Sequence, residues 1–394
     1  MKTRSLILLA GIGLCGVLCF LVSRSLSRGS VYQGKTVRTW LVQLSTAPTP
    51  QARAEAEAAF KALGTNAVPE LARLVRADDA RWRSLIWSHT GHLPRQLRAL
   101  LLRQAGTPNA YLVRPAAARV LAALGPGAAS AEPDLVQALQ DKVNGTYWEA
   151  GTALGRIGQP SVADLTRALQ DRDTLVRCAA AHGLGEAGPA AAPAVPALLQ
   201  LLKHGNPNEQ QGAAQSLARI GAPAVSPLLD LLLQDEGAIA QAAAGALLRY
   251  YSRTGPHPRA IENLPPDDTA SARQQAMARL GTSSLPDELV VKLLAGAAAD
   301  DPAPGVRVAA LQALAQGNRS ARLALPALVA CVRDDSPAIR QWTARALGTI
   351  TPPCKPAVGG LARLEQDQDE SVRAAAKAAL ASLTPAGTTN LLAH

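Results

Sequence analysis

Ten large hydrophobic residues recur along this 394-residue chain at nearly constant spacing. The first interval spans 61 residues, and each of the others spans 30 to 34. A fixed period of this length is typical of stacked repeats, in which each unit buries its apolar face only against its neighbours. We call these ten positions the rung residues: Phe60, Leu121, Leu154, Leu184, Leu217, Leu247, Leu280, Leu314, Leu347 and Leu380.

The residues before each rung residue predict the helix that carries it. Four positions earlier stands an alanine in nine of the ten units, and eight positions earlier stands a valine or isoleucine in six. Positions i, i+4 and i+8 lie along one stripe of a helix, so the buried stripe reads large, small, large. A second apolar run lies upstream of each such helix, and a proline introduces it at no cost to the first helical turn. Each unit is therefore predicted to be a helix, a turn and a second helix, with prolines opening the first helices: Pro69, Pro133, Pro160, Pro196, Pro227, Pro286, Pro326 and Pro356.

The turn between the two helices has its own pattern. An aspartate lies thirteen residues before the rung residue in six units, and an arginine lies seven residues before it in seven units. The two segments that begin at Asp334 and Asp367 show both, as Asp-Asp-Ser-Pro-Ala-Ile-Arg and Asp-Gln-Asp-Glu-Ser-Val-Arg. With these columns the sequence resembles the HEAT repeat family over roughly residues 36–383, including the bacterial variants named for their similarity to phycobilisome lyases.

The resemblance implies a structural role for the two charged columns. In that family the aspartates and arginines form a ladder of hydrogen bonds between neighbouring repeats. We therefore expect the following residues to support the fold rather than a binding site: Asp171, Arg177, Asp301, Arg307, Asp334, Arg340, Asp367 and Arg373.

The pattern and the composition together predict an all-α fold. Aromatic residues make up only 3% of the chain, and neither strand-like alternation nor Asn-Gly hairpin signals appear. We expect a right-handed α-solenoid, a superhelix of about ten HEAT-like helix pairs over residues 31–383, followed by a short tail at 384–394. The second helices are predicted to line a long concave face, a kind of surface that usually binds partners.

The first thirty residues predict one further helix, a transmembrane or signal segment. Lys2 and Arg4 precede seventeen uncharged and mostly apolar residues, 6–22, which is the lower limit for crossing a bilayer. We expect an uncleaved signal anchor within residues 1–30, and thus a single-pass membrane protein with its repeats on the extracytoplasmic side, the periplasmic side in a bacterium. A cleaved signal, which would leave a secreted protein, is the alternative.

The long first interval indicates an insertion at about residues 77–112. Between residues 71 and 120 there are nine arginines and two acidic residues, a balance of +7 out of +10 for the whole chain. Three interpretations stay open: an extra helical segment with solvated arginines, a docking site for a protein partner, or contact with an anionic surface such as lipid head groups or nucleic acid. The candidate partner-binding residues are Arg81, Trp82, Arg83, Trp87, Arg95 and Arg98.

A second departure from the repeat pattern lies at about residues 252–268. The period between rung residues survives there, but Gly255-Pro256-His257-Pro258 and Pro265-Pro266 leave room for only a short first helix. The segment is interpreted either as a hinge between the first six units and the last four, or as a local surface loop.

Motifs of enzymes and metal sites are absent from the sequence. There is no Walker loop, dinucleotide fingerprint, nucleophile elbow or His-Glu-x-x-His, and His89 with His92 has no further ligand nearby. We therefore expect a membrane-tethered scaffold or adaptor that binds proteins, without catalysis, cofactor, metal or small-molecule ligand. The alternatives are a phycobilisome-lyase-like enzyme or accessory factor, and binding to an anionic surface or nucleic acid through the insertion. Nucleic acid is the less favoured partner because an anchored or exported protein rarely meets it.

Overall fold

The computed structural model describes residues 30–77, 109–234, 237–254, 269–316 and 321–383. The predicted anchor, most of the arginine-rich insertion, residues 255–268 of the irregular segment and the tail lie outside these ranges. None of the helices within the described ranges is both long and apolar enough to cross a membrane. The chain divides into two compact units, Met1–Ser161 and Val162–His394, and each is considered by itself.

The described ranges of the first unit, 30–77 and 109–161, contain three pairs of helices. They are α2 (Val37–Thr46) with α3 (Pro50–Leu63), α4 (Val68–Val75) with α7 (Asn109–Leu124), and α8 (Glu132–Ala138) with α9 (Thr146–Ile157). Helices α4 and α7 pack together although the insertion separates them in the sequence, as the delayed second helix predicted. Residues 109–112, the last four of the predicted insertion at about 77–112, lie in the described part of α7.

A β-hairpin before α2 was not predicted. Strands β1 (Val31–Tyr32) and β2 (Lys35–Thr36) pair antiparallel around Gln33 and Gly34, both of which have positive φ. The sequence signal was weak because Gln-Gly replaces the usual Asn-Gly of such a turn. The indole of Trp40 in α2 is buried and donates to the Tyr32 carbonyl oxygen at 3.2 Å. The hairpin thereby packs against α2, the first helix of the first described pair.

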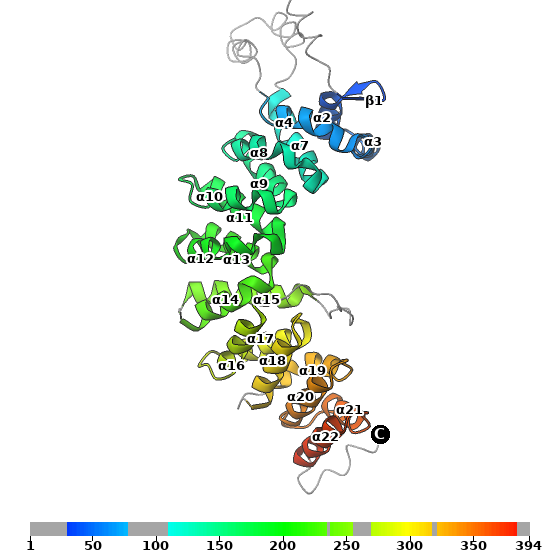
Figure 1. Ribbon diagram of the computed structural model, residues 1–394, viewed down its shortest axis with the longest axis vertical. Helices are drawn as coiled ribbons and strands as arrows, with labels where there is room; N and C mark the ends of the chain where they lie inside the picture. Colours follow the sequence, from blue (N-terminus) through cyan, green and yellow to red (C-terminus); the bar gives the residue numbers. More distant parts are fainter. Residues whose placement is uncertain (1–29, 78–108, 235–236, 255–268, 317–320, 384–394) are drawn as a thin grey trace, which may run out of the picture. The chain divides into compact units, whose positions relative to one another are not determined.

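The second unit contains thirteen helices within its described ranges (Figure 1). Three pairs lie before residue 255, and a single helix, α16, begins after residue 268 and is followed by three more pairs. The first helix that the pattern predicted before Leu280 falls in residues 255–268, outside the described ranges. The helices are α10 (Val162–Ala168), α11 (Thr174–Ala187), α12 (Val195–His204), α13 (Pro207–Ile220), α14 (Ala222–Gln234), α15 (Ala238–Thr254), α16 (Ala270–Gly281), α17 (Asp287–Asp300), α18 (Pro304–Gln316), α19 (Leu325–Cys331), α20 (Pro337–Gly348), α21 (Lys355–Leu364) and α22 (Glu370–Leu383).

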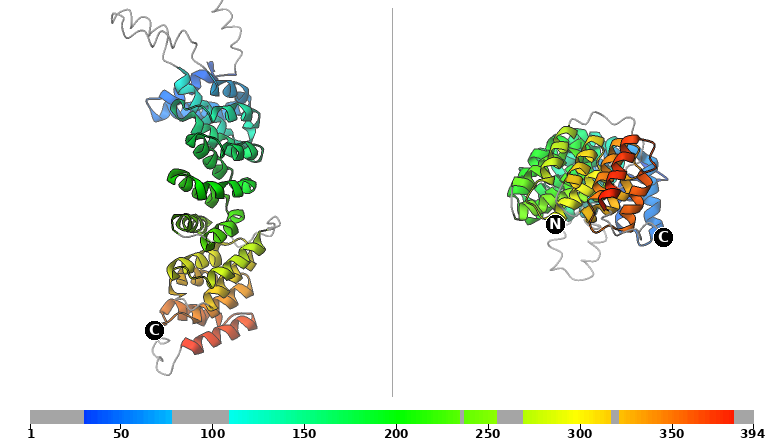
Figure 2. Two further views of the ribbon diagram at one scale, coloured as in Figure 1. Left: turned by 90° about the vertical axis from the view of Figure 1, so that its left-hand side faces the viewer. Right: turned by 90° about the horizontal axis from the view of Figure 1, so that it is seen from below.

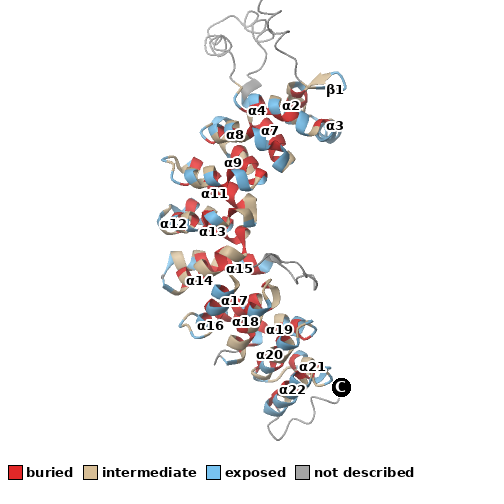
Figure 3. Cartoon of the chain, viewed as in Figure 1, coloured by how far each residue is buried: buried red, intermediate tan, exposed pale blue. Residues whose placement is uncertain are grey.

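The predicted buried stripe of the second helices is confirmed. All ten residues four positions before the rung residues are at most 2% exposed, including Thr343, the only one that is not alanine. Nine of the ten rung residues are buried as well, and Leu380 in α22 is half-buried. Figure 3 shows buried residues running through the interior of both units. The core is thus built from small residues that let neighbouring helices approach and large ones that fill the space between them.

The prolines lie mostly where the pattern placed them. Those of α4, α8, α12, α19 and α21 occupy the first turn. The other three are exceptions: Pro160 and Pro286 lie just before α10 and α17, and Pro227 lies inside α14. Gly221, with φ +85°, ends α13 and leads directly into α14, so this first helix begins at Ala222 without the 3-10 turn found in several other units.

The stacking of helices changes once within the second unit, at the irregular segment. Before it, the second helices α11, α13 and α15 pack in one row; after it, α16, α18, α20 and α22 pack in one row, and so do the first helices α17, α19 and α21. At the junction, first helix α14 packs against second helix α16, and second helix α15 packs against first helix α17 (Figures 1 and 2). We call this the layer exchange. The two kinds of helix change rows there, so the single continuous face of second helices that we expected is divided into two.

Candidate interaction faces

The predicted partner-binding residues Arg81, Trp82, Arg83, Trp87, Arg95 and Arg98 lie outside the described residues. What the structure describes is the two ends of the insertion. Arg76 at the first end pairs with Asp134 of α8 at 2.6 Å, and Arg114 near the other end donates to the Ala77 carbonyl oxygen at 2.6 Å. Ala77, the last described residue before the insertion, is therefore held against α7.

Exposed apolar side chains gather near the start of α7. Tyr111 at the start of α7 is 52% exposed and Trp148 at the start of α9 is 41% exposed, with Val143 also exposed. The Asn144 amide donates to the Tyr111 carbonyl oxygen at 3.2 Å and holds the two helix starts together. Trp148 was not among the predicted partner-binding residues, although its position six residues before Leu154 places it on the outer side of a second helix.

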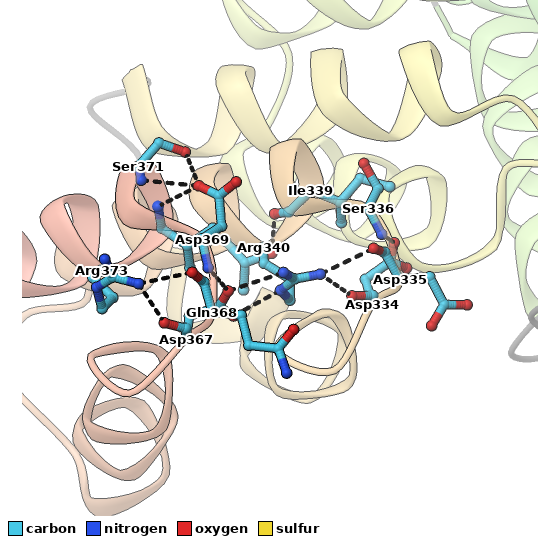
Figure 4. Close-up of polar contacts among 12 residues, drawn as sticks. Asp334, Asp335, Ser336, Ile339, Arg340, Asp367, Gln368, Asp369, Ser371 and Arg373 are labelled. Atoms are coloured by element: carbon cyan, nitrogen blue, oxygen red, sulfur yellow. Dashed lines mark hydrogen bonds and ion pairs between the residues drawn. The ribbon is translucent and has the colours of Figure 1, made fainter.

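The Asp and Arg columns form contacts between successive repeats, as Figure 4 shows for one pair. Arg340 of α20 donates to both carboxylate oxygens of Asp367 in the next unit, at 2.8 and 2.9 Å, and to the backbone oxygens of Asp334 and Asp335 in its own turn, at 2.8 and 3.0 Å. The Asp367 carboxylate also accepts from the Asp369 backbone N–H at 2.9 Å. The hydrogen bonds that Arg340 donates to Asp367 lower the pKa of the Asp367 carboxyl and raise the pKa of the Arg340 guanidinium. Each such pair joins a second helix to the following turn.

The other members of these columns repeat parts of the arrangement. Arg307 pairs with Asp334, and Arg114 pairs with Asp141 at 2.9 Å. Arg373 donates to the backbone oxygens of Asp367 and Gln368, each at 2.8 Å. The Asp171 carboxylate accepts from the Asp173 backbone N–H at 2.8 Å. These side chains already form hydrogen bonds and ion pairs within the repeats, so they have little bonding capacity left for a partner.

Arg177 has a partner that the sequence analysis missed. The position thirteen residues before Leu217 is His204 rather than aspartate, and the buried Glu209 of α13 accepts from Arg177 at 2.9 and 2.5 Å instead. Glu209 also accepts from the Asn206 backbone N–H at 2.8 Å in a capping box. The spacing Asn206-x-x-Glu209 is the signal that could have revealed it. A pocket of about 320 Å³, lined by Gln170, Gln200 and His204 among others, lies beside this pair.

One pair at the layer exchange is completely buried. The side chains of Arg273 in α16 and Asp301 after α17 are both 0% exposed, and two hydrogen bonds of 3.1 and 3.0 Å join them. The Asp367 and Arg340 side chains, by comparison, are 11% and 15% exposed. Tyr251 of α15 lies against the buried pair: burial raises the pKa of its hydroxyl well above the usual value, and the Asp301 carboxylate raises it further. We call Tyr251, Arg273 and Asp301 the junction cluster.

The outer side of the second helices carries the residues that the core and the ladder do not use. These lie six and two residues before each rung residue and two after it, opposite the buried stripe. Before the layer exchange they include an ionic row, in which His182 lies 3.9 Å from Glu186 and Arg219 lies 2.5 Å from the same carboxylate. We call this set the mixed face; it comprises Cys178, His182 and Glu186 of α11, Gln211, Gln215 and Arg219 of α13, and Gln241 and Arg249 of α15.

The corresponding face after the layer exchange has a different chemistry. Helices α16, α18 and α20 contain no aspartate or glutamate. Besides the ladder arginines Arg307 and Arg340, their half-buried or exposed polar side chains are Ser271, Arg279, Arg345 and five amides. We call the five amides alone the glutamine face; it comprises Gln274, Gln275, Gln312, Gln316 and Gln341.

Neither the described cysteines nor the described acidic and histidine side chains form an evident reactive centre. Within the described ranges, no group of three or more His, Cys, Asp or Glu side chains is placed to hold a metal ion. Burial raises the pKa of the Cys331 thiol to about 11, and burial also raises the pKa of Cys178. Because the thiolate is the nucleophile, both environments disfavour covalent chemistry.

We therefore expect Cys331 to resist alkylation in the folded protein. At pH 8, iodoacetamide should modify the half-buried Cys354 well before Cys331, which is 2% exposed and has the raised pKa. Mass spectrometry of tryptic peptides taken at successive times would measure both rates. Equal modification rates of Cys331 and Cys354 in the native protein would contradict the buried position of Cys331. So would a Cys331 rate that does not rise when urea unfolds the protein.

Comparison with known proteins identifies the repeat. A comparison with curated proteins found no match. Three similar solved structures are an engineered protein, human deoxyhypusine hydroxylase and a designed armadillo repeat protein. Their sequence identities are 19%, 22% and 18%, they cover 88%, 64% and 57% of this chain and 98%, 96% and 100% of their own, and their TM-scores are 0.35, 0.27 and 0.28.

The family model described as HEAT repeats matches residues 162–249, 258–348 and 290–381, which together are more than half of the chain. These matches span the second unit on both sides of the layer exchange. The chain belongs to the HEAT repeat family.

Proposed function

We propose that this protein is a scaffold that binds other proteins through the outer faces of its second helices. The observation that carries the proposal is that different sides of each second helix serve different purposes. One stripe is buried in the core, and the ladder arginines are bonded to turns, whereas the outer positions of the mixed face and the glutamine face serve neither purpose. A rigid row of helices that presents polar side chains outside the core and the ladder is suited to recognition.

We further propose that binding proceeds without catalysis. The raised pKa values of Cys178 and Cys331 support this because they disfavour thiolate chemistry at neutral pH. The alternative of a phycobilisome-lyase-like activity rests on the resemblance of the repeats, and none of the faces described above favours it over binding.

The scaffold is proposed to be tethered to a membrane by residues 1–30, with the repeats on the extracytoplasmic side. The support is the sequence alone: a basic start, an apolar stretch at 6–22 and no convincing cleavage site. A reporter fused to the carboxyl end would be active only outside the cytoplasm if this orientation is right, and activity confined to the cytoplasm would contradict it.

Site-specific photo-crosslinking in native membranes tests the scaffold role. A photoreactive amino acid would replace Gln215 on the mixed face, Gln341 on the glutamine face, or Arg363, an exposed residue of the first helix α21 that serves as control. We expect a discrete protein adduct from at least one second-helix position and none from Arg363. Adducts of equal yield at all three positions, or none at any of them, would contradict the proposal.

A further inference from the structure

The glutamine face combines three consecutive second helices into one amide-rich surface. Helix α16 packs against α18, and α18 packs against α20. Gln274 and Gln275 lie on α16, Gln312 and Gln316 on α18, and Gln341 on α20. Each helix therefore contributes at least one carboxamide to the same side of the second unit, where no carboxylate on these helices competes for its donors.

These five amides keep their hydrogen-bonding capacity. Within the described residues, none of their side chains has a hydrogen bond to another protein group. A carboxamide offers two N–H donors and one carbonyl acceptor, which complement the acceptor and the donor of a peptide bond. The chemistry of the face thus matches a polypeptide main chain better than it matches a charged group.

Small residues leave space for a main chain to come close. Ala278 on α16, Gly305 on α18 and Ala338 on α20 are all exposed among the amides. A Cβ atom at Gly305 would lie 3.4 Å from the Gln274 side-chain oxygen, which shows how directly the two helices meet here. Larger side chains at these positions would hold an approaching backbone beyond the reach of the glutamines.

One end of the face offers a site for a side chain. Trp342 of α20 is half-buried, and the Arg345 guanidinium lies 4.3 Å from the centroid of its ring. Arg345 is exposed and, like the rest of this face, has no acidic residue beside it on α16, α18 or α20. This favours an occupant that is neutral or acidic over one that is basic.

We propose that the glutamine face binds an extended polypeptide segment of neutral or acidic character, mainly by hydrogen bonds to its main chain. The proposal rests on the proposed scaffold function and names the form of its partner. Neighbouring helices lie about 8–10 Å apart and an extended chain advances about 3.3 Å per residue, so each helix would meet roughly every third residue. Recognition of the main chain would give affinity, and the ring of Trp342 would add a preference for an apolar side chain.

The test uses synthetic peptides as the probe. A displayed library of random 12-residue peptides would be selected on the full-length protein in detergent, and the tightest peptide would be measured by fluorescence anisotropy. The variant Gln274→Ala/Gln312→Ala/Gln341→Ala should weaken its binding about tenfold to a hundredfold, because three hydrogen bonds are removed. The matched control Gln211→Ala/Gln215→Ala/Gln241→Ala on the mixed face should change it less than twofold.

Two further results bear on the mode of binding. A peptide with N-methyl groups at alternate residues should lose most of its affinity if the main chain is read, and unchanged affinity would overturn the proposal. So would an equal loss in both triple variants, or a library that yields no binder. If those negative results came with a protein adduct at Gln341 in the crosslinking experiment, the scaffold role would stand and only the extended-peptide proposal would fall.

Discussion

Replacing Asp301 by asparagine should lower the free energy of unfolding of the second unit by about 3–5 kcal/mol. The change removes the negative charge but keeps an oxygen that can accept from the Ala303 backbone N–H, which now donates to Asp301 at 3.0 Å. Arg273 would then lose the negative charge of Asp301 while its own charged side chain stays at 0% exposure. Leaving one charge of a buried pair uncompensated is among the costliest single changes that a fold can suffer.

The matched control is Asp367→Asn. Asp367 makes the same two contacts, to an arginine of the preceding unit and to a backbone N–H two residues on, but its pair with Arg340 is 11–15% exposed. Water can solvate the arginine that remains, so we expect less than half of the effect of Asp301→Asn. Equal losses in the two variants would show that the junction cluster is not buried as described.

The measurement has to resolve parts of the array. Repeat proteins can unfold locally, and a single midpoint in urea then averages over several units. Hydrogen exchange of the amides in α16 and α17, read by mass spectrometry alongside the urea titration, would place the loss at the junction. A second variant, Arg273→Met together with Asp301→Asn, should recover much of the stability because no charge is then left buried.

Local structure could be predicted from the sequence because it follows from contacts within a unit. The stripe of Ala213 and Leu217, four residues apart, requires a helix with one buried side, and both residues are 0% exposed. The same holds for Ala310 and Leu314, at 0% and 3%. Repetition strengthened the prediction of each helix, because the same buried stripe recurs in ten units and one kind of helix explains all of them.

The stacking of units could not be predicted in this way. Leu247 and Leu280 are 33 residues apart, which is the ordinary period, yet the rows of helices exchange between them. Periodicity reports the length of a unit and the buried stripe of each helix. It does not report which neighbouring helix covers that stripe, because an apolar surface of alanine and leucine fits a first helix as well as a second one.

The candidate faces show the same limit. The insertion was conspicuous because its arginines and tryptophans break the pattern, whereas the glutamines of α16, α18 and α20 are ordinary surface residues one at a time. Their common position became visible only when the packing of the three helices placed Gln274, Gln312 and Gln341 on one side. Glu209 was missed for a related reason, because it replaces a ladder aspartate from a different position in the sequence.

The layer exchange itself can be tested at Gly296 in α17. A Cβ atom at this position would lie 2.6 Å from Cβ and 3.0 Å from Cγ of Tyr251 in α15. These atoms are close to the backbone of α15 and cannot swing aside, so the two helices would have to separate. We expect Gly296→Ala to lower the free energy of unfolding by about 1–3 kcal/mol through overpacking.

The control for this variant has the opposite expected sign. Gly245 lies in α15, and a Cβ atom there would meet nothing within 4 Å. Gly245→Ala should therefore raise the free energy of unfolding by about 0.5–1 kcal/mol, the ordinary gain from alanine inside a helix. Urea titrations of both variants would compare the two signs directly.

The sign at Gly296 decides between two ways of stacking the array. If α15 met α16 as second helices meet elsewhere in this unit, Gly296 would not face Tyr251, and Gly296→Ala would stabilise the protein as the control does. Destabilisation would support the exchange, and it should shrink in the background of Tyr251→Gly, since both clashing atoms, Cβ and Cγ of Tyr251, would be gone. Stabilisation by Gly296→Ala would instead contradict the layer exchange. It would indicate a single continuous row of second helices and a single binding face.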